Sequence, residues 1–141
     1  MQGPFNYEKR ERYAHLTKGE AEIWERYVKA FPNRFDEVYY DVELGLPIGY
    51  DPERPEPWKS HASYLGGYKI DVLGIKGDVS TIIEIKKMAT TKALGEVWLY
   101  EYLYKAFKKP IGKCELEIVT DFEMPHMREV CEADNVKLII V

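Results

Sequence analysis

The stretch 68–86 limits most strongly what this chain can fold into. Two apolar runs rich in β-branched residues lie on either side of Gly77-Asp78. Gly followed by Asp is a recognised two-residue hairpin loop, so the pattern predicts two antiparallel strands. Counting outward from this loop places Asp71 directly opposite Glu84, where two like charges destabilise a sheet.

Lys86 joins this acidic pair, because it lies two residues beyond Glu84 and every second side chain of a strand points to the same face. One interpretation is a solvated ion cluster at the end of a hairpin. The apolar neighbours Ile70 and Ile85 instead indicate central strands, where charged side chains are rarely buried without partners. Carboxylates suit Mg²⁺ or Mn²⁺, which hold a phosphodiester and lower the pKa of an attacking water. The hairpin therefore predicts a metal-dependent catalytic site.

The rest of the chain alternates helical and strand patterns. Thr17 and Glu20 have the spacing of a capping box, and an apolar stripe of helical period follows them. We expect a helix after Thr17, further helices at 89–109 and 124–134, and strands at 35–44, 114–120 and 136–141. Strand-helix-strand units form right-handed crossovers, so the last strands should be parallel. The order predicts a mixed α/β sandwich.

The connection 45–67 holds several prolines and glycines and predicts a long loop. It carries Lys59 and His61 together with Trp58 and Tyr64, a mixture that suits contacts with phosphates and bases. A surface loop with one tucked-in tryptophan is an equal alternative.

The composition of the chain is that of a folded globular protein. With 141 residues, 45% of them hydrophobic and 31% charged, we expect one folded domain over 1–141. The net charge of −4 disfavours coating of nucleic acid through bulk charge. No apolar run reaches the length of a membrane span, so we expect a cytoplasmic protein without membrane contact. The two cysteines, Cys114 and Cys131, lack metal-binding spacing and should be free thiols.

Asp71 followed by Glu84-Ile85-Lys86 resembles the D…ExK core of the PD-(D/E)XK nuclease superfamily, and in particular its archaeal Holliday-junction resolvase-like and exonuclease-like members. The resemblance implies a restriction-endonuclease-like fold, with an αβββαβ core, a central mixed sheet flanked by helices, and here an extra C-terminal helix and strand. The motif is short, so the order of elements carries much of the resemblance. Ile70 stands where the family has proline.

The resemblance also implies roles for individual residues. Asp71, Glu84 and the main-chain carbonyl of Ile85 would bind Mg²⁺ or Mn²⁺, and Lys86 would be the catalytic lysine. Glu20, on the N-terminal helix, would be a further ligand or a partner of the metal site through water.

Glu96 and Tyr100 are similar to the Q-x-x-x-Y element of many members, with Glu in place of Gln. We expect them near the substrate, together with Lys59 and His61 of the long loop. Glu96 would either reach a metal or pair with Lys92, four residues earlier.

Together these features predict a Mg²⁺-dependent nuclease that hydrolyses phosphodiester bonds in nucleic acid, most simply DNA. A homodimer is a further expectation. One alternative is a catalytically silent nucleic-acid-binding or assembly module with the same fold. Another is an α/β domain in which the motif is accidental. The substrate stays open between DNA and RNA, and between branched, single-stranded and duplex forms.

Overall fold

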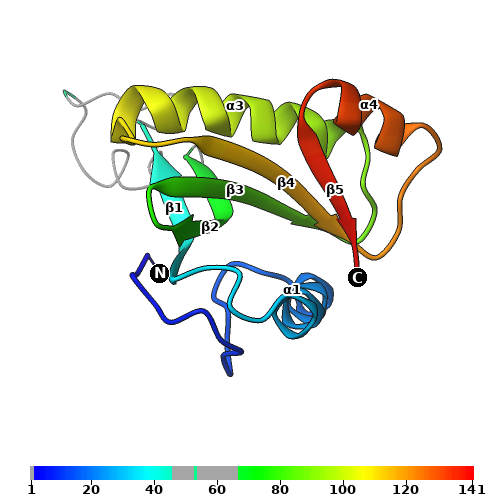
Figure 1. The fold of residues 1–141 in the computed structure, drawn as a ribbon, viewed down its shortest axis with the longest axis horizontal. Helices are drawn as coiled ribbons and strands as arrows, with labels where there is room; N and C mark the ends of the chain where they lie inside the picture. Colours follow the sequence, from blue (N-terminus) through cyan, green and yellow to red (C-terminus); the bar gives the residue numbers. More distant parts are fainter. Residues whose placement is uncertain (1, 46–52, 54–66) are drawn as a thin grey trace.

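The computed structural model describes residues 2–45, 53 and 67–141, and its elements follow the predicted order (Figure 1). They are α1 (Lys18–Ala30), β1 (Glu37–Leu44), β2 (Tyr68–Lys76), β3 (Val79–Lys86), α3 (Thr91–Lys108), β4 (Cys114–Thr120), α4 (Met127–Ala133) and β5 (Val136–Ile140). This is the αβββαβ order with an extra C-terminal helix and strand, so the predicted α/β fold class is confirmed.

The strands of the described residues form one mixed sheet with the order β1-β2-β3-β4-β5. The β1–β2 and β2–β3 pairs are antiparallel, and the β3–β4 and β4–β5 pairs are parallel. The parallel pairs are those joined by α3 and α4, as the crossover rule predicts. Figure 1 shows α3 and α4 on one side of the sheet and α1 on the other.

Each face of the sheet has its own apolar core. Val97 of α3 packs in one core with Ile82, and Trp24 of α1 packs in the other with Ile83. Neighbouring residues of β3 thus point to opposite faces, and both are fully buried. Burial on both faces explains why the sequence of β3 is almost continuously apolar.

The hairpin register agrees with the count from its two-residue loop. The last pair in the ladder between β2 and β3 is Val72 with Ile83. Asp71 and Glu84 come next on their strands. The two carboxylates therefore lie where the hydrogen-bonded ladder ends.

The capping box at the start of α1 is confirmed. The main-chain N–H of Glu20 donates to Thr17 Oγ1 at 3.3 Å, and the N–H of Thr17 donates to Glu20 Oε2 at 2.9 Å. No helix in the described part of the chain is both long and apolar enough to cross a membrane. Cys114 and Cys131 are free thiols, as predicted.

Two predicted helix starts are too early. The helix expected from residue 89 begins at Thr91, because Ala89 instead pairs with Glu123 in an isolated parallel bridge. The helix expected from residue 124 begins at Met127, because His126 has a φ of +68° and cannot belong to a right-handed helix.

The N-terminal segment, which has no clear sequence pattern, covers one edge of the sheet. Phe5 exchanges main-chain hydrogen bonds with Val38 of β1, and the N–H of Tyr40 donates to the carbonyl of Gln2 at 2.8 Å. An uncovered edge strand is prone to pairing with other chains, and this segment occupies the outer side of β1.

An ion pair with a buried carboxylate ties α1 and the chain after it to the sheet. Glu117 of β4 is 1% exposed, accepts a hydrogen bond from Tyr27 Oη at 2.7 Å, and pairs with Arg34 Nη2 at 2.8 Å. Both carboxylate oxygens of Glu117 therefore have a partner.

Replacing Arg34 by Met should lower the free energy of unfolding by about 3 kcal/mol, because the substitution leaves Glu117 charged and buried with only Tyr27 as partner. Urea unfolding followed by circular dichroism measures this loss. Arg26→Met is the matched control, since Arg26 pairs with Asp121 at 3.8 Å on an exposed surface and should contribute less than about 1 kcal/mol. Equal losses for the two variants would contradict the prediction.

Candidate active site

All the predicted site residues that the structure describes, except Ile85, line one hollow of about 470 Å³ at the end of the hairpin away from its loop. Its walls are His15, Glu20, Gly67, Tyr68, Lys69, Asp71, Glu84, Lys86, Glu96 and Tyr100. Lys59 and His61, which were expected to bind substrate, lie outside the described residues. The fold thus gathers side chains from α1, β2, β3 and α3 at one place.

Asp71 is tied to the neighbouring strand through its side chain. Its Oδ2 accepts a hydrogen bond from the main-chain N–H of Ile85 at 3.0 Å, at the point where the β2–β3 ladder ends. The side chain is 10% exposed. Asp71 is therefore held in place by the backbone of the strand that carries Glu84.

Glu84 is the most deeply buried carboxylate of the site, with 2% of the residue exposed. Its Oε1 lies 2.8 Å from Lys86 Nζ, whereas its Oε2 is buried and has no hydrogen-bond partner among the described residues. Burial, followed by the negative charge of Asp71, raises the pKa of Glu84 to about 10. The described residues alone leave one oxygen of this carboxylate without a hydrogen-bond partner.

Lys86 lies between two carboxylates, because its Nζ is also 3.2 Å from Glu96 Oε2. Burial acts to lower the pKa of Lys86, but the hydrogen bond and charge of Glu84 and the charge of Glu96 outweigh it and raise the pKa. Lys86 is therefore a fixed positive charge at neutral pH.

Glu96 pairs with Lys92 at 3.8 Å as well as with Lys86, so the pairing anticipated for it is confirmed. Burial alone would raise the pKa of Glu96, but a hydrogen bond with Glu84 and the charge of Lys86 lower it. The opposite shifts on the two glutamates place a shared proton on Glu84. Glu96 thus has a role at Lys86 that glutamine, which has no charge, would fill less well.

Glu20 and Tyr100 are the remaining predicted site residues that line the hollow. Glu20 reaches it from the first turn of α1, where its carboxylate also closes the capping box. Tyr100 is 9% exposed, and burial together with the charge of Glu84 raises its pKa, so its hydroxyl stays protonated.

His15 is a member of the site that the sequence did not reveal. It belongs to the unpatterned N-terminal stretch, and its Nε2 lies 3.3 Å from Asp71 Oδ1. The hydrogen bond to Asp71 raises the pKa of His15, although burial opposes this. A lone histidine in such a stretch carries no local signal, because its neighbour in space is 56 positions away in the chain (71 − 15).

The acidic pair fits a hard divalent cation. Within residues 2–45, 53 and 67–141, no group of three or more His, Cys, Asp or Glu side chains is arranged to hold a metal ion. Mg²⁺ needs fewer protein ligands, since it usually keeps several waters and is bound through one or two carboxylates plus substrate phosphate. Glu84 Oε2, which has no hydrogen-bond partner in the part of the chain that the structure describes, meets that requirement together with Asp71.

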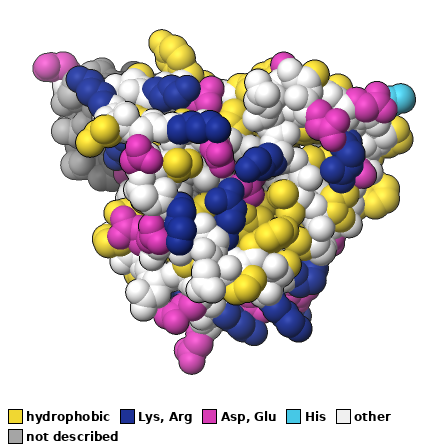
Figure 2. Space-filling view, viewed as in Figure 1, with side chains coloured by type: hydrophobic (Ala, Val, Ile, Leu, Met, Phe, Trp, Pro, Cys, Tyr) yellow, Lys and Arg dark blue, Asp and Glu magenta, His cyan; other side chains and the backbone are white. Residues whose placement is uncertain are grey.

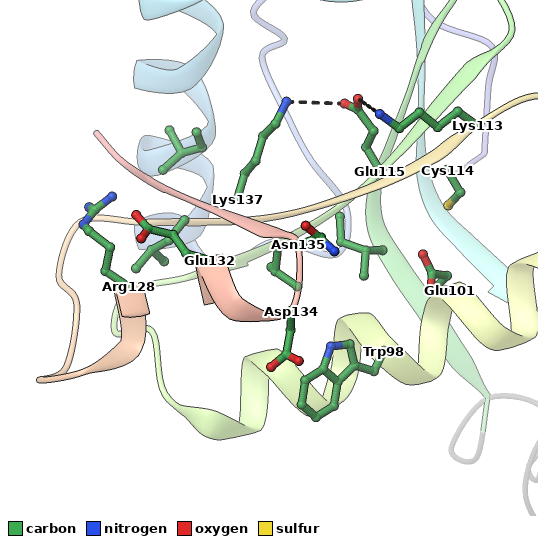
Figure 3. Close-up of a pocket in the computed structure, with 14 residues that line it drawn as sticks. Trp98, Glu101, Lys113, Cys114, Glu115, Arg128, Glu132, Asp134, Asn135 and Lys137 are labelled. Atoms are coloured by element: carbon green, nitrogen blue, oxygen red, sulfur yellow. Dashed lines mark hydrogen bonds and ion pairs between the residues drawn. The ribbon is translucent and has the colours of Figure 1, made fainter. Parts of the chain in front are cut away.

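A larger hollow of about 830 Å³ lies elsewhere, between α3, α4 and β5 (Figure 3). Lys113 and Lys137 both pair with Glu115 on its wall, at 3.4 and 3.5 Å. These charges satisfy one another, and the lining residues bear no strongly desolvated carboxylate. The smaller hollow is therefore the better candidate for catalysis.

Charged side chains of both signs are mixed on one face of the molecule (Figure 2). Figure 2 shows lysine and arginine side chains interspersed with acidic ones on the face that it draws. This mixture agrees with the net charge of −4 and favours local contacts with a charged ligand over broad electrostatic attraction.

Comparison with solved structures shows one protein whose backbone fold is similar to that of this chain. No family model matches the chain, and no curated protein matches it. A solved EndoMS–dsDNA complex aligns with 94% of this chain at 12% identity and a TM-score of 0.49. The alignment covers 48% of the EndoMS chain, so this chain spans about half the length of that protein. Evidence on function therefore comes from the side chains of the site.

Replacing Glu84 by Gln is expected to stabilise the metal-free protein. At pH 7 Glu84 is ionised in the unfolded chain but protonated in the folded one, because its folded pKa is about 10, so folding must take up a proton. Gln removes this requirement, and the free energy of unfolding in EDTA should rise by about 1–3 kcal/mol at pH 7. The gain should shrink as the pH falls toward 4.5, where glutamate is protonated in both states.

Glu96→Gln is the matched control for urea unfolding of the Glu84 variant. The pKa of Glu96 is lowered in the fold, so its charge stabilises the protein at pH 7 and its loss should decrease stability. A destabilised Glu84→Gln protein, or a gain that does not depend on pH, would contradict the assignment of the buried proton.

Proposed function

We propose that this chain is a metal-dependent nuclease of the PD-(D/E)XK type that hydrolyses phosphodiester bonds in nucleic acid. The observation that carries the proposal is the buried Oε2 of Glu84, which has no hydrogen-bond partner among the described residues and lies in a site with Asp71 and Lys86. A buried, incompletely paired carboxylate is costly to a fold unless something binds it. A divalent cation would satisfy it.

Asp71 and Glu84 would hold Mg²⁺ or Mn²⁺, with the main-chain carbonyl of Ile85 as a third ligand. A bound divalent cation polarises a phosphate oxygen and lowers the pKa of the attacking water. Glu20 would be a further ligand or a partner of the metal site through water, while its Oε2 accepts the N–H of Thr17.

Lys86 would stabilise the negative charge that develops on the phosphate. Because the pKa of Lys86 is raised, it carries a proton at neutral pH and acts as a positive donor rather than as a general base. Glu96 supports this role, since its carboxylate 3.2 Å away keeps the ammonium in place.

The partner we propose is DNA, contacted locally at the mouth of the hollow. Lys69 lines it beside Tyr68, so the rim offers a cation for phosphate and an aromatic ring for a base. The chain has an excess of acidic residues, which suits a small footprint on the nucleic acid.

Lys86→Ala should reduce cleavage of single-stranded, duplex or branched DNA by about 10²-fold or more, because it removes a charge that acts in the transition state. The measurement compares cleavage by the two proteins in Mg²⁺, Mn²⁺ and EDTA. Lys76→Ala is the matched control, since Lys76 lies at the other end of β2 and pairs with Asp36 on the surface. Cleavage in EDTA, or full activity of the Lys86 variant, would refute the mechanism.

The alternative is a silent module that binds nucleic acid without cutting it. The same assay separates the two functions when binding is followed by fluorescence anisotropy. Binding without cleavage in any metal would favour the silent module. The buried Glu84 speaks against it, because a protein that only binds gains nothing from a carboxyl group that must take up a proton on folding when no cation binds it.

Homodimerisation remains a prediction. Trp98 and Tyr102 lie one turn apart on α3 and are 45% and 71% exposed, and β5 forms the outer strand of the sheet of the described residues. Analytical ultracentrifugation should give twice the monomer mass of 16.5 kDa, and Trp98→Glu should return the protein to a monomer. A monomer at all concentrations of the unchanged protein would rule the dimer out.

A further inference from the structure

His15 bridges two buried carboxylates that come from different strands. Its Nε2 lies 3.3 Å from Asp71 Oδ1, and its Nδ1 lies 3.5 Å from Asp41 Oδ1. The side chains of Asp41 and Asp71 are 9% and 10% exposed, whereas that of His15 is 39% exposed. The half-buried imidazole therefore joins two buried acidic groups.

Asp41 occupies an irregular position in β1. Asp41 and Asp71 face each other across the β1–β2 ladder. The pairs on either side of them are Tyr40 with Val72 and Val42 with Ile70. Asp41 has a φ of +53°, a conformation that few residues other than glycine adopt within a strand.

This irregularity changes which face of the sheet the strand buries. Val38 and Tyr40 belong to the core on the α1 side, whereas Val42 and Leu44 belong to the core on the α3 side. In a regular strand, residues an even number apart share a face, so the alternation of the β1 side chains changes at Asp41, although the pairing of β1 with β2 keeps the same register on both sides. Strained backbone of this kind persists where the surrounding structure requires it, and it is found often at functional sites.

Asp41 does not line the hollow of the site, but His15 does. The contact with His15 connects Asp41 to a residue that lines the hollow. Asp41 holds Nδ1, and this orients the ring so that Nε2 faces Asp71.

The contact of His15 with Asp71 matters because a carboxylate rotates easily about its last bond. The corresponding torsion of Asp has a broad, two-fold distribution rather than sharp minima. In this structure Asp71 Oδ2 is held by the N–H of Ile85 and Oδ1 by His15. With one partner on each oxygen the plane of the carboxylate is set, and each oxygen retains a lone pair for a cation.

We propose that Asp41 and His15 form a positioning pair that presets the carboxylate of Asp71 for binding a divalent cation. The proposal rests on the proposed metal-dependent function and extends it to the N-terminal segment, which thereby belongs to the active site. His15 and Asp41 act through Asp71 and are not themselves ligands. Partners that orient a metal-binding side chain typically change metal affinity by about 10–100-fold when removed.

The test is a double-mutant cycle on Mn²⁺ affinity, measured by electron paramagnetic resonance of free Mn²⁺ without substrate. His15→Ala should raise the dissociation constant about 10-fold or more, and Asp41→Asn should raise it by a smaller factor. Because Asp41 acts only through His15, the double variant should be no weaker than His15→Ala alone. His15→Gln, whose amide N–H still donates to Asp71, should recover part of the affinity.

A purely structural tether between the N-terminal segment and the sheet would behave differently. Phe5→Ala removes a ring of the same segment that packs against Tyr40 and does not line the hollow, so it should lower thermal stability and leave Mn²⁺ affinity unchanged. If His15→Ala and His15→Gln both lose stability but bind Mn²⁺ like the unchanged protein, or if the effects of His15 and Asp41 add, the positioning role is overturned.

The outcomes also separate this inference from the function on which it rests. An unchanged protein that binds Mn²⁺ and cuts DNA, with His15 variants that do both equally well, overturns the positioning pair alone. An unchanged protein that binds no Mn²⁺ overturns both.

Discussion

The buried carboxylate of Glu84 is the constraint on which the candidate site depends. A glutamate that is 2% exposed raises the free energy of the fold unless its charge is neutralised, and here Lys86 and a retained proton provide that only in part. The sheet keeps Glu84 there because β3 is buried on both faces by apolar neighbours. The packing of the whole of β3 thus keeps the destabilising Glu84 in place, and such a local loss of stability is common at functional sites.

The end of the β2–β3 ladder makes this arrangement possible. While two strands remain paired, their main-chain groups bind each other. Beyond Val72 and Ile83 the side chain of Asp71 takes the N–H of Ile85 instead, so a carboxylate enters the interior of the sheet. The α3 helix then brings Glu96 to Lys86, and the start of α1 brings Glu20 to the same hollow. Each contribution comes from an element whose position the two apolar cores define.

Much of the fold was predictable because its signals are local. The two-residue loop set the register of the hairpin, the capping box set the start of α1, and strand-helix-strand order predicted the parallel pairs. The errors lie where the signal is not local. Ala89 and its neighbours have helical composition, but a bridge to Glu123 takes Ala89 out of the helix, and no pattern near residue 89 indicates that contact.

The sequence by itself determined that Asp71, Glu84 and Lys86 would meet, since hairpin register and strand periodicity are geometric consequences of a short stretch of chain. Only the tertiary structure decided what else would surround them. His15 and Asp41 come from an unpatterned segment and from an irregular point in β1, and the contacts of His15 with Asp41 and Asp71 depend on how the N-terminal segment passes over the sheet. Pairing within a hairpin is specified by neighbours in sequence, whereas a meeting of distant segments is specified by the packing of the complete fold.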